Sequence, residues 1–256
     1  MHDFAYRRAA SADDLGRLPI GAVLLAGGQS LLPMVKARDV RPPLIVDVKP
    51  MLPRGVRLDG NRLVIGAGTT HAELAADPVL RSEAPCLADL ADHVGDPSVR
   101  HRGTLGGALV SDHPAGDWPP VALALDAMLT TTERTVSFED WRGDSARTGE
   151  VVLEVALRRP EAAGYVKLLH PAQRYAIVGA LAARVDEREF RAVTGLYVEG
   201  ARLWNGRPND AAIRSDGFAA PDYRAALAVE LVRRAETLRD GTAPFARAIV
   251  HGQARG

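Results

Sequence analysis

The chain has 256 residues, 46% of them hydrophobic, which is enough for one large domain or for two to three smaller lobes. Lys plus Arg and Asp plus Glu are equal at 32 each, so no net charge favours a nucleic acid or an acidic membrane as partner. The single cysteine, Cys86, excludes an internal disulfide and cannot supply the thiolates of an iron–sulfur cluster, so any such cluster would lie on another chain.

No segment predicts a membrane span. The first residues, MHDFAYRRAASADD, lack the apolar core of a signal peptide. The longest apolar run, VALALDAML, is interrupted by Asp126 and is too short to cross a bilayer. We therefore expect a cytoplasmic protein without membrane insertion.

The first part of the chain predicts helices and strands in alternation. SADDLGRL predicts a helix capped by Ser11, and AVLLAGG predicts an apolar strand. Ser30 then begins a helix over LLPMVKARD, where Pro33 is tolerated in the first turn. PPLIVDVKP is typical of a buried strand, and VRLDGNRLVIGAG predicts a hairpin that turns at Gly60.

The middle of the chain predicts helices and then strands. Helices are expected over THAELAADPVL, APCLADLADHVG and VALALDAML, the second ending at Gly95. TTERTVSF and EVVLEVALRRP are expected as strands. Lobe boundaries are placed near Pro53 and Pro160, giving segments 1–53, 54–159 and 160–256.

The last third predicts a small sheet and a helix. GYVKLLH, YAIVGALAARVD and FRAVTGLYVEGARLW suggest a meander of strands, and PDYRAALAVELVRRAETL predicts a helix. No internal repeat or low-complexity segment interrupts the chain.

One glycine motif looks like a dinucleotide-binding fingerprint but departs from it. VIGAGTTHAEL carries Gly66 and Gly68 after a strand, as in the G-x-G-x-x-G motif, but His71 stands where the third glycine should be. A helix-to-helix pattern follows in place of a parallel strand. We therefore interpret these glycines as a tight strand-to-helix turn.

Two other glycine pairs favour an anion site. In AGGQS, Gly27 and Gly28 permit positive φ, so that successive amides can converge on an anion, while Ser30 begins a helix. GTLGGALVSDHPAGD, with Gly106 and Gly107, is a second such loop. The residues alone leave two interpretations open: a pyrophosphate cradle, or turn glycines beside a helix cap.

The two loops together resemble a known family. LLAGGQSLLPMVK, followed at this distance by RHRGTLGGALVSDHPAGD, is similar to the FAD-binding medium subunits of molybdenum hydroxylases, the carbon monoxide dehydrogenase and xanthine dehydrogenase flavoprotein group. FAYRRAAS, VIGAGTTHAELAADPVL, ADHVGDPSVRHRG and YVKLLHPAQRYAIVGALA extend the resemblance over about residues 3 to 185. It implies an α+β fold, with a two-lobed FAD-binding region of the PCMH or vanillyl-alcohol-oxidase type and a C-terminal domain of small sheet and helices.

The resemblance also implies which residues bind FAD. The first loop would wrap the pyrophosphate with backbone amides and comprises Ala26, Gly27, Gly28, Gln29, Ser30 and Leu31. The second would complete the cradle and comprises Thr104, Leu105, Gly106, Gly107 and Ala108. Asp117 matches an acidic residue that accepts hydrogen bonds from ribose or ribityl hydroxyls, and Lys167 matches a position that contacts the flavin. Val94 and Gly95 match the segment that passes the isoalloxazine ring.

The chain departs from the family pattern in several places. Ala108 stands where Asn or Ser is usual, which removes a side-chain hydrogen bond but no backbone donor. EDWRGDSART is shorter than the usual loop, and GLYVEGARLWNG replaces a glycine-rich turn. LLHPAQRY keeps Arg174 and Tyr175 but has His170 and Pro171 in place of a basic cluster. The departures in LLHPAQRY and GLYVEGARLWNG lie in the C-terminal part, which would carry the docking surface and the covering of the flavin.

The function implied is electron transfer through non-covalent FAD. Substrate would be oxidised on a large molybdopterin subunit, and 2Fe–2S clusters on a small subunit would pass the electrons to this flavin and then to an external acceptor. Such a heterotrimer would be a xanthine, aldehyde or carbon monoxide dehydrogenase, and the chain alone would not act on substrate. Two alternatives stay open: a stand-alone FAD oxidoreductase of the same fold, and a degenerate assembly subunit.

No catalytic acid or base and no metal ligand is predicted. His101 and His113 lack the spacing of a metal-binding pair, and we expect them to be ordinary polar residues. Trp118, Trp141 and Trp204 are expected to pack in the core or at an interface.

Overall fold

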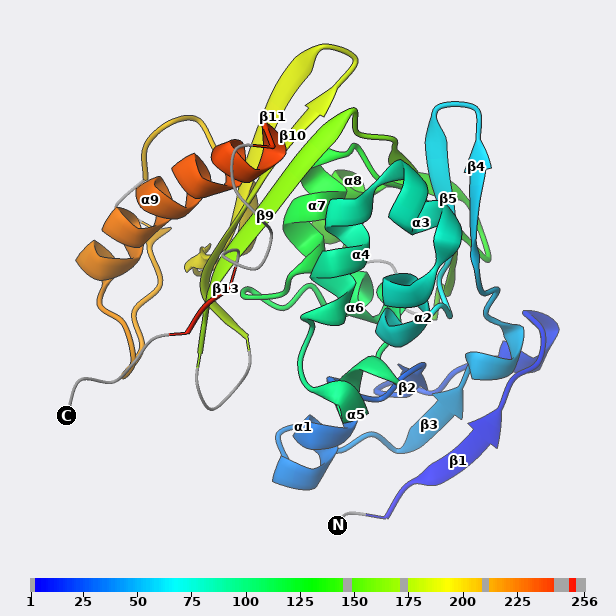
Figure 1. Ribbon diagram of the computed structural model, residues 1–256. Helices are drawn as coiled ribbons and strands as arrows, with labels where there is room; N and C mark the ends of the chain where they lie inside the picture. Colours follow the sequence, from blue (N-terminus) through cyan, green and yellow to red (C-terminus); the bar gives the residue numbers. More distant parts are fainter. Residues whose placement is uncertain (1–2, 145–148, 171–174, 209–211, 242–248, 252–256) are drawn as a thin grey trace.

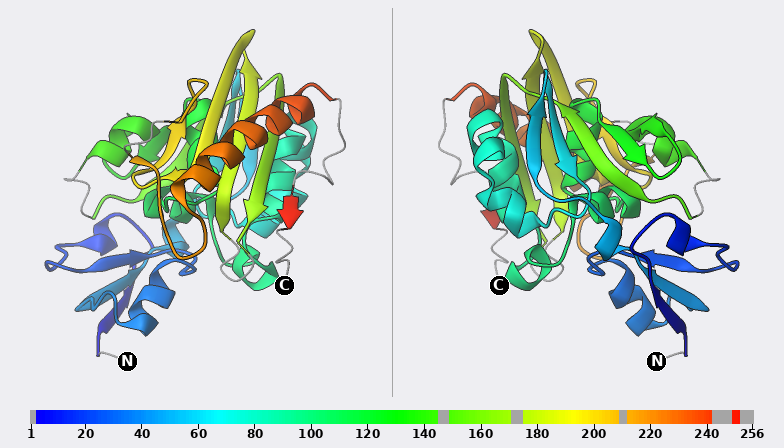
Figure 2. Two further views of the ribbon diagram at one scale, coloured as in Figure 1. Left: turned by 90° about the vertical axis from the view of Figure 1, so that its left-hand side faces the viewer. Right: turned by 90° about the vertical axis from the view of Figure 1, so that its right-hand side faces the viewer.

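The computed structural model describes residues 3–144, 149–170, 175–208, 212–241 and 249–251, and their strands form three sheets (Figures 1 and 2). The expected boundaries near Pro53 and Pro160 fall between these sheets. We call residues 3–53 lobe 1 and residues 54–159 lobe 2. The strands after residue 159 form the third sheet, which we call the C-terminal sheet. Figure 2 shows lobe 1 below the other two in both views.

Lobe 1 is a small parallel sheet with one helix. Its strands lie in the order β1-β3-β2, and both outer strands run parallel to β3. The elements are β1 (Ala5–Arg8), β2 (Val23–Leu25), α1 (Leu31–Ala37), β3 (Leu44–Asp47) and the short 3₁₀ turn η2 (Lys49–Met51). The predicted strands and α1 are confirmed, whereas β1 was not expected.

The expected helix over SADDLGRL is wrong in length. Only the 3₁₀ turn η1 (Asp13–Leu15) forms, with Ala12 rather than Ser11 at its N-cap. Gly16 follows with φ +53°, a left-handed value that turns the chain away from helix. The segment continues instead toward β2.

Lobe 2 combines an antiparallel sheet with a group of helices. The sheet order is β4-β5-β8-β6-β7, and β5 pairs antiparallel with both neighbours, which excludes the βαβ unit that a Rossmann fingerprint requires. Its strands are β4 (Val56–Asp59), β5 (Arg62–Gly66), β6 (Met128–Thr131), β7 (Thr135–Ser137) and β8 (Val152–Arg158). Its helices are α2 (His71–Ala76), α3 (Pro78–Glu83), α4 (Pro85–Asp92), α5 (Pro97–Arg100), α6 (Leu105–Ser111), α7 (Trp118–Ala124) and α8 (Phe138–Gly143).

The predicted helix over VALALDAML is wrong in its second half. Helix α7 ends at Ala124, and Asp126 takes a left-handed φ of 48°. Residues after it enter β6, which forms a hairpin with β7. Met128 and Leu129, the last two residues of that apolar run, therefore belong to a strand, because a short apolar run does not distinguish a buried strand from a helix.

The C-terminal sheet is buried on both faces. Its order is β12-β11-β10-β9-β13, with β9 (Ala162–Leu169), β10 (Ala176–Val185), β11 (Arg188–Tyr197), β12 (Gly200–Leu203) and β13 (Ile249–His251). Successive residues of β10 pack on opposite sides: Leu181 and Ala183 belong to the core of lobe 2, and Ala180 and Ala182 to the core under α9 (Pro221–Arg239). The predicted meander and final helix are thus confirmed, and the sheet shares a core with lobe 2.

Two of the three tryptophans are fully buried. Trp118 and Trp141 are each 1% exposed and pack in the core of lobe 2, as expected. Within the described ranges, no helix has the length and apolar character needed to cross a membrane.

Candidate functional site

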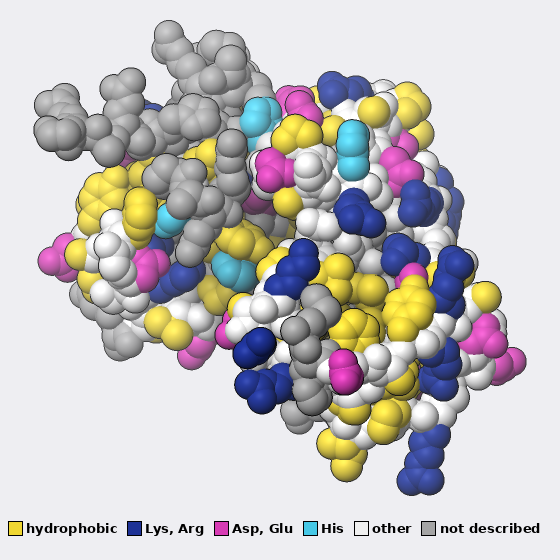
Figure 3. Space-filling view, turned by 90° about the horizontal axis from the view of Figure 1, so that it is seen from below, with side chains coloured by type: hydrophobic (Ala, Val, Ile, Leu, Met, Phe, Trp, Pro, Cys, Tyr) yellow, Lys and Arg dark blue, Asp and Glu magenta, His cyan; other side chains and the backbone are white. Residues whose placement is uncertain are grey.

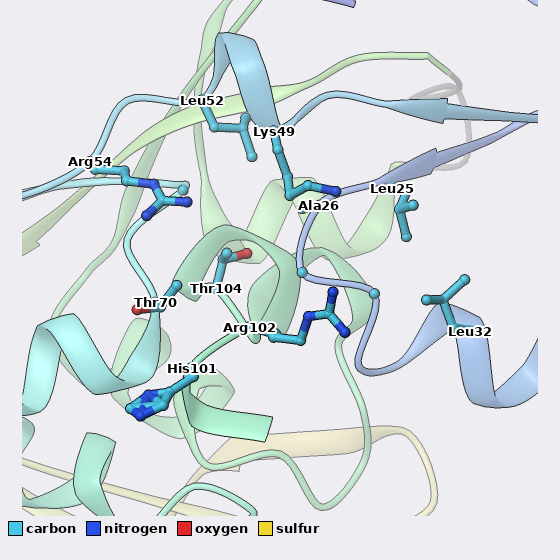
Figure 4. A pocket seen from close by; sticks show the side chains of 13 residues that line it. Leu25, Ala26, Leu32, Lys49, Leu52, Arg54, Thr70, His101, Arg102 and Thr104 are labelled. Atoms are coloured by element: carbon cyan, nitrogen blue, oxygen red, sulfur yellow. The ribbon is translucent and has the colours of Figure 1, made fainter. Parts of the chain in front are cut away.

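A pocket of about 250 Å³ lies between lobe 1 and lobe 2 (Figure 4). Lobe 1 contributes Leu25, Ala26, Gly27, Gly28, Leu32, Lys49 and Leu52. Lobe 2 contributes Arg54, Gly68, Thr70, His101, Arg102 and Thr104. The lining is apolar on the lobe 1 side at the leucines and cationic across the middle, with two hydroxyl groups from lobe 2. Such a mixture suits a ligand that carries both a ring system and negative charge.

The first glycine loop forms one wall of the pocket with its bare backbone. A Cβ on Gly27 would stand 2.1 Å from the carbonyl oxygen of Arg102, so only glycine allows lobe 1 to approach lobe 2 this closely. Gly28 has φ +75°, the left-handed value expected of a converging loop. Ser30 occupies the N-cap position of α1 but makes no capping bond with its side chain.

The backbone amides of the first loop are available to a ligand. Among the residues that the structure describes, none accepts a hydrogen bond from the amides of Gly27, Gly28, Gln29 or Ser30. A buried or half-buried amide without an acceptor is costly, and an anion at this loop would satisfy several at once. The first loop therefore fits a phosphate-bearing group such as the expected pyrophosphate.

The second glycine loop is built differently from the first. The amides of Leu105 and Gly106 donate to the carbonyls of Thr69 and Ala67, each at 3.0 Å, and the amide of Gly107 donates to Thr104 Oγ1 at 3.1 Å. These amides are therefore occupied, and the loop does not mirror the first one as an amide cradle. Neither glycine of this pair has a positive φ, because both lie in α6.

The glycines of the second loop serve close packing. A Cβ on Gly106 would stand 2.6 Å from Cβ of Ala67, and one on Gly107 would stand 2.9 Å from Thr104 Oγ1. They allow α6 to begin directly against the chain that leaves β5. Thr104, the N-cap of α6, is the member of this loop that lines the pocket.

Two of the cationic side chains that line the pocket form ion pairs with acidic side chains. Lys49 Nζ lies 2.9 Å from Asp47 Oδ2, and the hydroxyl of Tyr6 donates to the same carboxylate at 2.7 Å. Burial opposes ionisation of Asp47, but these hydrogen bonds hold the pKa of its carboxyl below the usual value. On the other side, Arg54 Nη1 lies 2.9 Å from Glu73 Oε1.

Glu73 has a second role at the start of α2. Its carboxylate accepts from the amide of Thr70 at 2.7 Å, and Thr70 Oγ1 accepts from the amide of Glu73 at 3.2 Å, forming a capping box. Burial opposes ionisation here too, but the bonds from Thr70 and Arg54 lower the pKa of Glu73. Thr70 is therefore the N-cap of α2.

Asp117 and Lys167 form a buried ion pair outside the pocket. Lys167 Nζ donates to Asp117 Oδ2 at 2.9 Å and to the carbonyl of His93 at 2.9 Å, and the hydroxyl of Tyr165 donates to Asp117 Oδ1 at 2.6 Å. Burial, together with the charge of Asp117, raises the pKa of Tyr165 well above its usual value. Lys167 thus bonds both to Asp117 and to the backbone of His93, the residue just before Val94.

Val94 and Gly95 form the turn between α4 and α5. Their carbonyls each lie 3.4 Å from Arg100 Nη1, and Gly95 has φ +56° with Val99 packed against it. The ion pair of Asp117 and Lys167 therefore holds this turn through His93 rather than reaching the first loop directly.

A buried imidazole packs beneath the second loop. Trp118 Nε1 donates to His71 Nδ1 at 3.2 Å, and burial lowers the pKa of His71 to about 4. Its ring also lies close to Gly103, where an added Cβ would approach to 3.0 Å. His71 is therefore neutral at pH 7 and supports the segment that carries Arg102 and Thr104.

The sequence-predicted residues thus divide into three groups. The pocket brings together Ala26, Gly27, Gly28 and Thr104. Gln29, Ser30 and Leu31 continue the first loop, and Leu105, Gly106, Gly107 and Ala108 begin α6 behind Thr104. Asp117 and Lys167 form the buried ion pair outside the pocket, and Val94 and Gly95 form the half-buried turn that follows His93. Arg174 and Pro171 lie outside the described residues, whereas Tyr175 stacks on His113 with ring centroids 3.9 Å apart.

Sequence reasoning missed the charged lining of the pocket. Lys49, Arg54 and Arg102 come from three separate segments, and no motif links them. The one available signal was that Arg102 immediately precedes the second glycine loop. Across the described ranges, no group of three or more His, Cys, Asp or Glu side chains is placed to hold a metal ion.

Comparison with protein families and solved structures gives one consistent result. Residues 2–159 match the family described as the FAD binding domain in molybdopterin dehydrogenase. The carbon monoxide dehydrogenase medium chain of Hydrogenophaga pseudoflava is 44% identical over 115 residues, which span 44% of this chain and 40% of that protein. The nicotine 6-hydroxylase medium subunit of Paenarthrobacter nicotinovorans is 29% identical over 82% of this chain and 87% of that subunit.

The solved structures resemble this fold over nearly its full length. Carbon monoxide dehydrogenase from Hydrogenophaga pseudoflava superposes with a TM-score of 0.82 at 27% identity, covering 94% of this chain and 98% of that one. Quinoline 2-oxidoreductase from Pseudomonas putida 86 gives a TM-score of 0.81 at 25% identity with the same coverage. The two-lobed FAD-binding architecture with its C-terminal sheet and helix is therefore the fold of this chain.

Proposed function

Since the chain belongs to the family of FAD-binding domains in molybdopterin dehydrogenases, we propose that it is the FAD-carrying medium subunit of a molybdenum hydroxylase complex. In that complex a large molybdopterin subunit oxidises the substrate, and 2Fe–2S clusters on a small subunit pass electrons to this chain. An external acceptor then takes them. The observation that carries the proposal is the first loop: its amides have no acceptor among the described residues, and Gly27 and Gly28 line a cationic pocket at a place where lobe 1 and lobe 2 touch through Gly27.

The residues of this chain bind and orient, and they supply no acid or base. FAD, when bound, supplies the redox chemistry, because it accepts and releases electrons at its isoalloxazine ring. The first loop would hold the diphosphate through the amides from Gly27 to Ser30, and Thr104 would offer its hydroxyl from the opposite wall. Lys167 and Asp117 neutralise one another in the interior and would fix the turn at Val94 and Gly95.

The cysteine content supports the placing of the iron–sulfur clusters on a partner subunit. Cys86 is the one cysteine of the chain; it is buried, and burial raises the pKa of its thiol to about 12. One cysteine cannot hold an iron–sulfur cluster, and its thiol is not ionised at neutral pH. Iron–sulfur centres would therefore belong to a partner.

The first experiment asks whether the purified chain carries FAD without a covalent link. We expect a yellow protein whose flavin is released by acid precipitation and runs as FAD in chromatography. FMN in its place, flavin retained by the precipitate, or a colourless protein after incubation with excess FAD would contradict the proposal. The last result would favour an assembly subunit without cofactor.

The second experiment separates the medium subunit from a stand-alone oxidoreductase. The FAD-loaded chain, given an aldehyde, a purine or carbon monoxide, should show no bleaching of the flavin absorbance. Dithionite-reduced flavin should still be reoxidised by an added acceptor. Co-expression with the large and small subunits should restore substrate-driven bleaching. Turnover of an organic substrate by the lone chain would replace the proposal with the stand-alone enzyme.

A further inference from the structure

We propose that Arg102 supplies the counter-charge for the diphosphate of FAD, an inference that rests on the proposed function. Neither the glycine loops nor the family resemblance assigns this residue. Arg102 lines the pocket at the point where its own backbone meets the first loop.

The position of Arg102 follows from the contact between lobes. The carbonyl oxygen of Arg102 and the Cα of Gly103 are the atoms closest to the missing side chain of Gly27, at 2.1 and 2.9 Å from a Cβ built there. The side chain of Arg102 therefore starts beside the loop that presents free amides. Figure 4 shows it extending toward Ala26 and Leu32, on the pocket side of that loop. A diphosphate bound to the amides would lie within reach of its guanidinium.

Arg102 differs from the other cations of the pocket in having no acidic partner among the described residues. Lys49 is paired with Asp47, and Arg54 with Glu73, so their positive charges are offset locally. Among the residues described, the guanidinium of Arg102 makes no hydrogen bond and no ion pair. Binding of a diphosphate to Arg102 would therefore break no existing pair, whereas binding to Lys49 or Arg54 would compete with a carboxylate.

The chemistry of arginine suits this role. A guanidinium is charged at all working pH values and can donate two parallel hydrogen bonds to phosphate oxygens. Because Arg102 is exposed, part of its attraction is screened by solvent and salt. On the face that Figure 3 shows from below, Lys and Arg side chains are interspersed with Asp and Glu side chains.

The test compares Arg102→Gln with Arg81→Gln in the full chain freed of flavin. Arg81 is also exposed and lies on α3, outside the pocket, so the control makes the same change in net charge. The affinity for FAD is measured by quenching of flavin fluorescence at several salt concentrations. We expect Arg102→Gln to weaken FAD binding about five- to tenfold and to flatten its salt dependence, while Arg81→Gln behaves like the wild type.

A second measurement identifies the part of the ligand that Arg102 recognises. ADP and adenosine compete with FAD in the same titration, and they differ only in the diphosphate. The wild type should prefer ADP over adenosine, and Arg102→Gln should lose that preference by the same factor by which it loses FAD affinity. Equal affinities of wild type and Arg102→Gln for FAD, or an unchanged preference for ADP, would overturn the inference and leave the proposed function intact. A wild-type chain that binds no FAD would overturn both.

Discussion

Gly27 and Arg102 touch through their backbones: a Cβ on Gly27 would lie 2.1 Å from the carbonyl oxygen of Arg102, closer than the 3.0 Å below which real Cβ atoms essentially never come. The contact joins the loop after β2 to the segment before α6. Lobe 1 and lobe 2 therefore meet at a point where any side chain would force them apart, and this point borders the pocket.

Gly27→Ala should accordingly open the pocket. The added methyl group cannot be accommodated by a flexible neighbour, because the opposing atoms are backbone. We expect FAD affinity to fall by about tenfold or more, which corresponds to about 1.4 kcal/mol, with both lobes still folded. Fluorescence titration measures the affinity, and far-UV circular dichroism checks the fold. Gly143→Ala is the matched control, since no atom lies within 4 Å of its added Cβ.

Gly28→Val should abolish retention of FAD for a different reason. Gly28 has φ +75°, where a β-branched residue is strained by roughly 1–2 kcal/mol. Its Cβ would also stand 2.9 Å from Cδ1 of Leu32, another residue of the pocket. The loop should relax to a conformation in which the amides no longer converge. Gel filtration followed by the absorbance ratio at flavin and protein wavelengths reports retention. Normal FAD content in a folded variant would mean that the loop is only a turn.

Gly107→Ala should act on stability more than on the cofactor. Gly107 is helical, and its amide donates to Thr104 Oγ1, the cap of α6. A methyl group 2.9 Å from that oxygen would disturb the cap, and losing a cap costs about 1 kcal/mol. Chemical unfolding should show this loss, with FAD affinity changed less than in Gly28→Val. A variant with normal stability and no FAD would instead place Gly107 in direct contact with the ligand.

The local features of this fold could be predicted from sequence. The hairpin at Gly60 has a turn signal between two strand-like runs, and the first glycine loop follows a strand and precedes a helix. Such signals span a few residues, and local conformation decides them. The strand β1 escaped because three of its four residues are exposed, so it shows little apolar pattern.

The non-local features could not be predicted. Both glycine pairs look alike in sequence, yet in the second loop the amides of Leu105 and Gly106 donate to the carbonyls of Thr69 and Ala67, which lie far earlier in the chain. The pairing of Lys167 with Asp117 joins residues 50 positions apart. Resemblance marked those two residues but could not show that they neutralise each other, because that depends on how the C-terminal sheet packs on lobe 2.

Lys167→Met should be strongly destabilising. Lys167 is fully buried, and its removal would leave the carboxylate of Asp117 in the interior with Tyr165 as its one remaining donor among the described residues. Breaking a buried pair in this way costs about 3–5 kcal/mol. The double variant Lys167→Met, Asp117→Asn should recover much of the loss, because a neutral amide still accepts from Tyr165. The free energy of unfolding is measured by denaturant titration of the wild type, Lys167→Met and the double variant. Equal losses in the single and double variants would show that packing, not charge, is what Lys167 provides.

The imidazole of His71 should make stability depend on pH. Burial lowers the pKa of His71 to about 4 in the folded chain, whereas an unfolded histidine titrates near 6.5. Between these values the unfolded chain binds a proton that the folded chain does not, so stability is lost as the pH falls through this window. The loss amounts to about 3 kcal/mol between pH 7 and pH 4.

His71→Gln isolates this contribution from the carboxylates that titrate in the same range. Glutamine does not titrate, and its amide oxygen can accept the hydrogen bond from Trp118 Nε1. The free energy of unfolding should therefore fall less steeply with decreasing pH in the variant, by about 3 kcal/mol over the same interval. Parallel profiles for the two proteins would mean that His71 takes up its proton as readily in the folded chain as in the unfolded chain. In that case it could not accept the bond from Trp118, and the support beneath Gly103 and Arg102 would need another explanation.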